Sequence, residues 1–140
     1  MSAERETRLI VISPASEITP DQVSRAIHAM GKNVTVKESC YGAVVEGQRD
    51  IVRQVVSEIK SMDPNGVFSK VRAYPAGDPR RCRAHHGTRP GFAQLEQEWN
   101  DLWKIQYGLD RADRGEKARK RKTPGKLPVG EFKKICEVKR

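Results

Sequence analysis

The sequence predicts an α+β fold, and three observations carry that prediction. Short apolar runs rich in β-branched residues alternate with segments in which apolar residues recur at helical spacing. Glycine, proline and asparagine separate these segments. The charge is unevenly distributed: residues 1–75 hold 10 Lys and Arg against 9 Asp and Glu, whereas residues 76–140 hold 17 against 9. A nearly neutral domain therefore precedes a basic extension.

The first strand and the first helix have the clearest patterns. Residues 7–13 contain four consecutive apolar residues, which is typical of a strand buried on both faces. Thr19 is placed to cap a helix, Pro20 suits the first helical position, and Gln22 completes a capping box. The apolar residues that follow lie on one helical stripe: Val23, Ala26, Ile27 and Met30.

Four further elements complete a βαββαβ order. Residues 33–39 alternate as in a half-exposed edge strand, and residues 43–45 form a second apolar run. A helix from Gln48 to Ile59 and an alternating strand over 67–73 follow. Right-handed crossovers turn this order into a ferredoxin-like split βαβ sandwich, with the first and third strands in the middle of one sheet.

We expect three parts in the chain: a ferredoxin-like domain over 1–75, an arginine-rich loop and amphipathic helix over 76–110, and a basic extension over 111–140. The helix begins near Phe92 and ends near Leu109, with Trp99 and Trp103 on its apolar stripe. The stretch from Arg111 to Lys126 has no apolar period and is expected to be a flexible or partner-ordered linker. A short stripe returns in the last residues: Phe132, Ile135 and Val138.

Composition excludes several classes of protein. No apolar run approaches the length that spans a membrane, and no apolar segment of a secretory signal precedes the first strand. Three widely spaced cysteines do not predict a disulfide framework. We therefore expect a cytoplasmic protein without a membrane partner, whose net charge of +9 favours an acidic partner surface or a polyanion.

The chemically richest segment, residues 80–86, is weighed as a thiol or metal site. Cys82 and His85, joined by His86 or by Cys40, supply ligands of the types that bind zinc. A structural zinc site needs four ligands, however, and no second pair of ligands is present, so a solvated basic loop is favoured. Cys82 as a nucleophile lacks an orienting third group, and Cys40 is better read as a small buried apolar residue. The sequence predicts no catalytic residue, metal or cofactor, and hence no enzyme.

Two binding hypotheses remain. The first is docking on an acidic protein through Arg80, Arg81, Arg83, Arg89, Trp99 and Trp103. In that hypothesis the tryptophans anchor a partner only if the open face of the sheet is already covered; otherwise they are core. The second is a nucleic-acid-binding module, in which the basic run Lys117 to Lys122 grips phosphates. The central strands lack the aromatic residues that stack on bases in sheets of this topology, which makes nucleic acid the weaker of the two hypotheses.

Three segments resemble a known family. They are TRLIVISPASEITPDQVSRAIHAM, VTVKESCYGAVVEG and YPAGDPRRCRAHHGTRPGFAQLE, and the resemblance covers about Thr7 to Glu98. The chain resembles methanogenesis marker protein 6, a small family of methanogenic archaea, in its Cys40-Tyr41-Gly42 and in the arginine-rich segment that begins at Asp78. The basic tail beyond Leu109 lies outside this resemblance.

The resemblance implies a cytoplasmic accessory protein of methanogenesis. Several marker proteins are associated with the ATP-dependent activation of methyl-coenzyme M reductase, whose nickel tetrapyrrole must be reduced before it works. By this analogy the protein is a non-catalytic subunit or helper of the activation machinery, beside an ABC-type ATPase and iron–sulfur electron carriers. The family has no assigned catalytic residues to carry over, and Cys40 with Cys82 would contribute to a metallocluster only if the fold brought them together.

Overall fold

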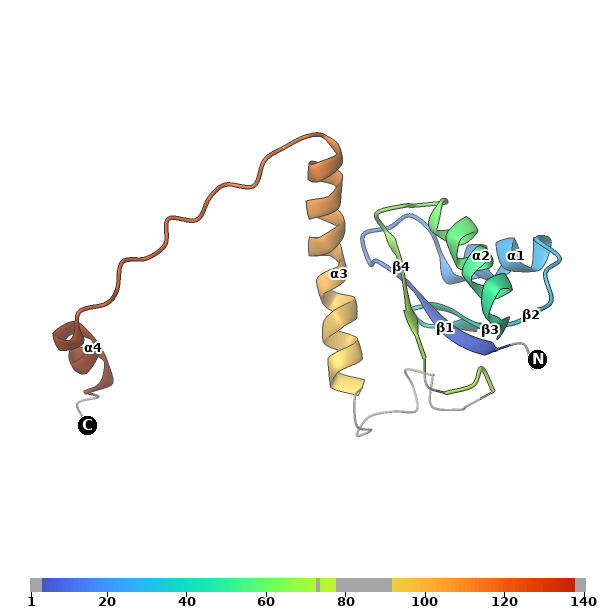
Figure 1. Cartoon of the computed structure of the whole chain (residues 1–140), viewed down its shortest axis with the longest axis horizontal. Coiled ribbons are helices and arrows are strands. Elements are labelled where there is room, and N and C mark those ends of the chain that lie inside the picture. Colours follow the sequence, from blue (N-terminus) through green and yellow to red (C-terminus); the bar gives the residue numbers. More distant parts are fainter. Residues whose placement is uncertain (1–3, 73, 78–91, 138–140) are drawn as a thin grey trace.

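The computed structural model describes residues 4–72, 74–77 and 92–137 (Figure 1). The elements follow one another as β1 (Arg5–Ile12), α1 (Pro20–Ala29), β2 (Val34–Ser39), β3 (Gly42–Gln48), α2 (Arg49–Lys60), β4 (Val67–Val71), α3 (Phe92–Asp113) and α4 (Val129–Cys136). The fold is a mixed α/β arrangement, and the predicted order of the first six elements is confirmed.

The four strands form one antiparallel sheet in the order β2-β3-β1-β4. The prediction that the first and third strands lie in the middle is therefore confirmed. Both central strands are apolar on two faces, whereas β2 and β4 are edge strands with partly exposed side chains. The backbone N–H of Ser13 continues the pairing at one end, where it donates to the carbonyl oxygen of Gly66 at 2.8 Å.

Helix α1 begins at the predicted cap. The Thr19 hydroxyl accepts the N–H of Gln22 at 3.3 Å, and the Gln22 side chain accepts the N–H of Thr19 at 2.9 Å, which together form the capping box. Pro20 occupies the first turn, where its missing N–H costs nothing. The predicted start of this helix is therefore confirmed.

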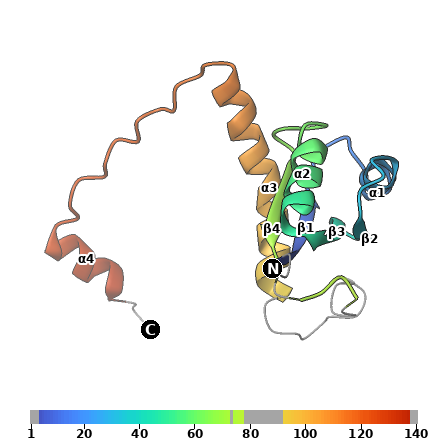
Figure 2. The same cartoon turned by 45° about the vertical axis from the view of Figure 1, so that its right-hand side comes forward.

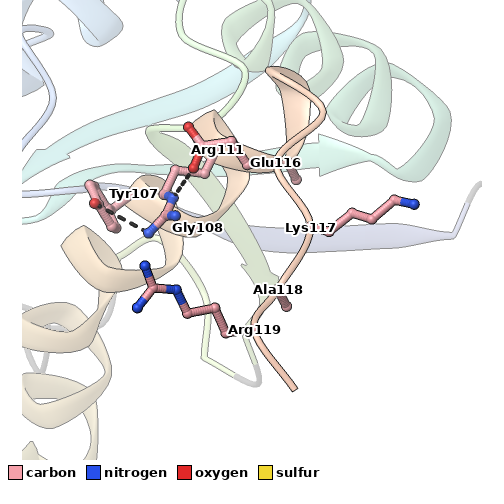
Figure 3. A pocket seen from close by; sticks show the side chains of 8 residues that line it. Tyr107, Gly108, Arg111, Glu116, Lys117, Ala118 and Arg119 are labelled. Carbon is pink, nitrogen blue, oxygen red and sulfur yellow. Dashed lines mark hydrogen bonds and ion pairs between the residues drawn. The ribbon is translucent and has the colours of Figure 1, made fainter. Parts of the chain in front are cut away.

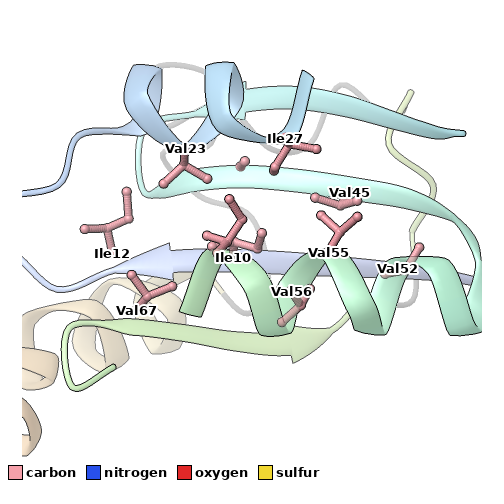
Figure 4. Packing of buried hydrophobic residues seen from close by; sticks show 11 residues of the cluster. Ile10, Ile12, Val23, Ile27, Val45, Val52, Val55, Val56 and Val67 are labelled. Atoms are coloured by element: carbon pink, nitrogen blue, oxygen red, sulfur yellow. The ribbon is translucent and has the colours of Figure 1, made fainter. Parts of the chain in front are cut away.

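One face of the sheet packs against α1 and α2 (Figure 4). Alternate residues of β1, Ile10 and Ile12, point to this side and are almost completely buried. Helix α2 has no side-chain cap at its start, and it is held instead by its buried stripe. The members of the cluster are Ile10, Ile12, Val23, Ile27, Ala43, Val45, Val52, Val55, Val56, Ile59 and Val67.

The opposite face of the sheet packs against α3. Leu9 and Val11 of β1 point to this side, and with Val44 of β3 they form a second apolar cluster. Tyr41, Ala76 and Leu102 complete the buried set, with Phe68 and Trp99 packed against it. Part of the predicted 76–110 segment thus shares a core with the strands. The predicted divisions after residues 75 and 110 stay predictions.

The predicted end of the third helix is wrong by about one turn, since α3 continues through Arg111 to Asp113. Residues 116–128 then have no regular secondary structure, and α4 lies away from the sheet and from α3 in both views (Figure 2). The apolar stripe predicted near the end of the chain is helical over Val129–Cys136. Among the described residues, no helix combines the length and apolar character that crossing a membrane requires.

A buried glutamate joins the start of β1 to α2. Glu6 is 8% exposed, forms an ion pair with Arg8, and lies 3.3 Å from the Nε of Arg49 and 3.5 Å from the Nη2 of Arg53. Burial alone would raise the pKa of Glu6, but the hydrogen bond from Arg8 and the three guanidinium charges lower that pKa below its ordinary value. These contacts fix the first strand to the second helix.

Replacing Gly42 with alanine should destabilise the fold. A Cβ atom at Gly42 would lie 2.3 Å from the backbone carbonyl oxygen of Ile10, so the central pair of strands would have to separate. We expect Gly42→Ala to lower the free energy of unfolding by about 2–3 kcal/mol in urea titrations. The control is Gly108→Ala in α3, where a Cβ meets nothing within 4 Å and should stabilise the helix by about 0.5–1 kcal/mol. Equal effects of the two substitutions would contradict the close approach at Gly42.

Candidate functional site

The predicted site residues fall into two groups. Arg80, Arg81, Cys82, Arg83, His85 and Arg89 lie outside the described residues. Cys40, Trp99 and Trp103 are described, and the fold places them in three different environments. The docking and thiol hypotheses for the arginine-rich segment therefore stay predictions.

Cys40 lies in the turn between β2 and β3 and is exposed. The expectation that it is a small buried residue is wrong, because its neighbour Tyr41, at 2% exposure, turns into the apolar cluster instead. Within the part of the chain that the structure describes, no three His, Cys, Asp or Glu side chains gather into a metal-binding group. Cys82 lies outside that part, so a metallocluster that joins Cys40 to Cys82 is not tested.

Trp99 belongs to the core between α3 and the sheet. Its indole N–H donates to the carbonyl oxygen of Ile12 at 3.0 Å, and its ring meets that of Tyr41 edge-on, with centroids 5.5 Å apart and an interplanar angle of 64°. The preceding residue, Glu98, forms an ion pair of 2.6 Å with Lys70 of β4. For Trp99 the structure favours the core interpretation over that of a partner anchor.

Trp103 lies one turn further along α3 and points outward. It is 49% exposed, and Tyr107, four residues later on the same side of the helix, is 57% exposed. A cation lies near each ring: the Lys104 ammonium is 5.9 Å from the centroid of Trp103, and the Arg111 guanidinium is 5.4 Å from that of Tyr107. We call Trp103 and Tyr107 the aromatic face of α3.

A hollow of about 610 Å³ lies between the end of α3 and the chain that follows it (Figure 3). Tyr107 and Arg111 line the helix side, and Lys117 and Arg119 line the other. Arg111 is held in place by an ion pair of 2.5 Å to Glu116 and a hydrogen bond of 3.4 Å to the Tyr107 hydroxyl. The hollow is therefore rich in cations, although one of them already has a carboxylate partner.

The chain beyond α3 forms a basic arm, which we define as residues 114–137. It contains nine Lys and Arg against three Asp and Glu, and every residue in it is exposed. Its helix α4 has no buried side chain, and Val129, Phe132 and Ile135 are 82%, 58% and 68% exposed. At helical spacing these residues share one side with Cys136, whereas Lys133 and Lys134 lie on the other sides.

Glu46 fixes the backbone that leads from β4 toward the arginine-rich segment. Its carboxylate accepts the N–H of Ala76 at 2.7 Å and a hydrogen bond from Arg5 at 3.1 Å. The N–H of Ala76 is the main cause that lowers the pKa of Glu46 below its ordinary value, and Arg5 adds to the effect against the opposing influence of burial. The partners of Glu46 are 30 and 41 residues away in the sequence, so no local pattern identifies this carboxylate.

Sequence reasoning also missed Tyr107 as an exposed anchor. The signal was present, since Tyr107 follows Trp103 by four residues and therefore lies on the same side of the helix. Leu109, which continues the apolar spacing of this helix, is 38% exposed. The apolar residues of α3 contact the sheet only as far as Leu102. Trp99 is therefore part of the core, whereas Trp103 is exposed.

Comparisons with known proteins identify a family and a full-length relative. The model of the family described as "Uncharacterized protein conserved in archaea (DUF2102)" matches residues 9–110, which include the whole sheet beyond the start of β1 and most of α3. The chain is 38% identical over 145 residues to the uncharacterized protein MJ0498 of Methanocaldococcus jannaschii, with 95% of this chain and 93% of the relative covered. No solved structure matches the chain significantly.

The two tryptophans should respond differently to truncation. Trp99→Ala removes a ring from the second apolar cluster and leaves the Ile12 carbonyl without the indole donor, so we expect a loss of about 3 kcal/mol in unfolding free energy. Trp103→Ala serves as the matched control on the same helix and should change that free energy by less than about 0.5 kcal/mol. Urea unfolding followed by circular dichroism measures both. A larger loss from the Trp103 variant would contradict the assignment of Trp99 to the core.

Glu46 should make stability depend on pH in the acid range. Because folding lowers the pKa of Glu46, its contribution is complete above the ordinary pKa near 4.5 and is lost as pH falls through the lower, folded value. Glu46→Gln should therefore cost about 1–2 kcal/mol at pH 7 and progressively less as the medium is acidified toward pH 3. The measurement is urea unfolding at several pH values, with the exposed Glu17→Gln as control. A cost for Glu46→Gln that stays constant with pH would refute this role of the carboxylate.

Proposed function

The chain belongs to the archaeal family DUF2102. We propose that it is a non-catalytic accessory or assembly protein that works by binding other proteins. The binding element in this proposal is the basic arm. The arginines at 80, 81, 83 and 89 are proposed as a second contact with the same acidic partner.

The observation that carries the proposal is the separation of charge and packing between the body and the arm. Residues 1–113 contain 16 Lys and Arg against 15 Asp and Glu, whereas residues 114–137, the arm, contain 9 against 3. The arm ends in a helix of 8 residues, and no apolar side chain of that helix is buried against the part of the chain that the structure describes. Helices this short are marginal in water alone, so α4 gains most of its stability when a partner covers Val129, Phe132 and Ile135.

The proposed setting is the ATP-dependent activation of methyl-coenzyme M reductase in methanogenic archaea. Two observations support it: a 38% identical relative in Methanocaldococcus jannaschii, and the sequence resemblance to methanogenesis marker protein 6. An acidic surface on one of the activation components would match the charge of the arm.

A further proposal concerns the fold. We assign the first six elements to the ferredoxin-like class. The support is the βαββαβ order, the antiparallel pairing of every neighbouring pair of strands, and the order β2-β3-β1-β4. Many unrelated functions use this architecture, so the assignment itself carries no function.

The non-catalytic part of the proposal rests on how the perturbed carboxylates are used. Glu6 and Glu46 both have a lowered pKa, which often marks a functional site. In this protein each of them holds two segments of the fold together through arginine or backbone partners. The lowered pKa values of Glu6 and Glu46 are therefore explained by their structural contacts, without a catalytic role.

The alternative is nucleic-acid binding by the arm. One observation favours it: Lys117 to Lys122 is an exposed basic run that begins beside the cationic hollow and the ring of Tyr107. Against it, α3 covers Leu9, Val11 and Val44 on the face of the sheet that related folds use for RNA. Protein binding is better supported, because phosphate contacts leave the apolar side of α4 without a role.

Affinity purification from a methanogen tests the proposal. The tagged full-length chain should co-purify with components of the reductase-activation machinery. Phe132→Asp, which puts a charge on the apolar side of α4, should reduce their recovery about tenfold or more. Gly130→Asp is the matched control, because it adds the same charge on the opposite side of the same helix.

Two outcomes would decide against protein docking. One is recovery that consists of RNA and is lost after nuclease treatment. The other is recovery of the activation components that the Phe132 variant leaves unchanged. Steep loss of a nucleic-acid complex with salt would support the alternative instead.

A further inference from the structure

Exposed apolar side chains are concentrated in α3 and the basic arm. Of eleven large apolar side chains that are exposed in the described residues, eight lie in these two segments. The eight are Trp103, Ile105, Tyr107, Leu109, Leu127, Val129, Phe132 and Ile135. The two segments are consecutive in the chain but separate in space, so they form two exposed apolar surfaces, one on α3 and one on α4.

Helix α3 and the arm are complementary in charge. Helix α3 carries five carboxylates against two cations, whereas the arm carries nine cations against three carboxylates. Asp110 and Asp113, at the end of α3, both accept hydrogen bonds from the amide of Asn65, at 2.8 and 2.7 Å. Asn65 carries no charge, so these hydrogen bonds do not neutralise the two exposed carboxylates, which can attract a cation.

The two surfaces also match in length. From Trp103 to Asp110 the helix rises about 10 Å, and the 8 residues of α4 span about 12 Å. Phe132 and Ile135 on α4 are spaced to contact Trp103 and Tyr107, which lie one turn apart. Lys133 borders the apolar side of α4 at helical spacing, so a carboxylate on a docked surface could pair with it.

The end of α3 turns the chain so that Lys117 and Arg119 border the hollow beside Tyr107, while α4 lies away from the aromatic face of its own chain. Gly115 adopts a left-handed φ of +76°, its N–H donates to Ala112 at 2.9 Å, and the N–H of Glu116 donates to the carbonyl of Arg111 at 3.1 Å. The ion pair between Arg111 and Glu116 fastens the same turn. In both views the chain then leaves α3, and α4 lies far from it (Figures 1 and 2).

We propose that α4 of one copy seats on the aromatic face of α3 in a second copy, and that the reciprocal contact closes a two-fold dimer. Each copy supplies one arm and one seat, so the assembly closes without leaving either surface free. Trp103, which the sequence indicated as an anchor for a partner, is in this proposal the anchor for another copy of the same chain. This inference goes beyond the proposed function, because it needs no other protein.

The purified full-length chain tests the proposal by sedimentation equilibrium and light scattering. The mass should be twice the 15.8 kDa of one chain. Phe132→Asp and Trp103→Asp should each weaken the dimer about thirtyfold or more, since each removes a central anchor. Gly130→Asp and Ile105→Asp are the matched controls: Gly130 lies opposite the apolar side of α4, and Ile105, 48% exposed, lies on the other side of α3 from Trp103. Circular dichroism confirms that each variant is folded.

Mixing the two defective variants gives the decisive measurement. The Phe132→Asp copy keeps an intact seat and the Trp103→Asp copy keeps an intact arm, so an equimolar mixture should form a heterodimer through one contact. Each variant alone should remain a monomer under the same conditions. Raising the salt concentration from about 0.1 M to about 1 M should weaken the wild-type dimer several-fold, because the lysines and the carboxylates are exposed.

Three results would overturn the proposal. They are a full-length chain that is monomeric at about 100 μM, a dimer that both anchor substitutions leave intact, and variants that fail to complement each other. The Trp103→Asp variant also separates this proposal from the proposed function. It should lose the dimer and still capture the activation components through its intact arm, so either claim can fail without the other.

Discussion

Strand β1 is apolar on both faces, and the rest of the structure depends on covering both of them. Ile10 and Ile12 require the helices α1 and α2, whereas Leu9 and Val11 require a layer on the other side. Burying a side chain of this kind contributes about 1.5–3 kcal/mol, so leaving Leu9, Val11 and Val44 in water would cost a large part of the stability of a domain this small. That constraint recruits α3, which lies more than 80 residues away in the sequence.

Helix α3 is much longer than the strip of sheet that it covers. Its 22 residues rise about 33 Å, whereas the five residues of β4 extend about 17 Å. Among the described side chains of α3, Trp99 and Leu102 reach the core, and the residues from Trp103 onward are mostly exposed. The part of α3 that extends beyond the sheet is therefore available for contacts with other molecules. The same element that completes the core presents the aromatic face and sets the direction of the arm.

The sequence predicted the elements whose signals are local. The capping box at Thr19 and Gln22, the two-faced runs of β1 and β3 and the order of the strands were all predictable, because periodicity and end signals lie within a few residues. Contacts made across the chain were not. The divergence of Trp99 from Trp103 depends on where α3 crosses the sheet, and the Glu46–Ala76 hydrogen bond joins residues that are 30 positions apart, so no local spacing encodes either. Cys40 was misjudged because its neighbour Tyr41 takes the buried place at the same turn.

The two proposed uses of α4 exclude each other, and this exclusion has a physical consequence. If Val129, Phe132 and Ile135 are covered by a second copy, they are not accessible to a partner, so the apparent affinity for that partner falls with the fraction of free arms. The cations in the part of the arm between α3 and α4 remain exposed in either case, because they do not lie on the apolar side of α4. They can therefore attract an acidic partner before the helix is released. Self-association would in this way protect an apolar helix from nonspecific contacts, at the cost of part of the binding energy for the correct partner.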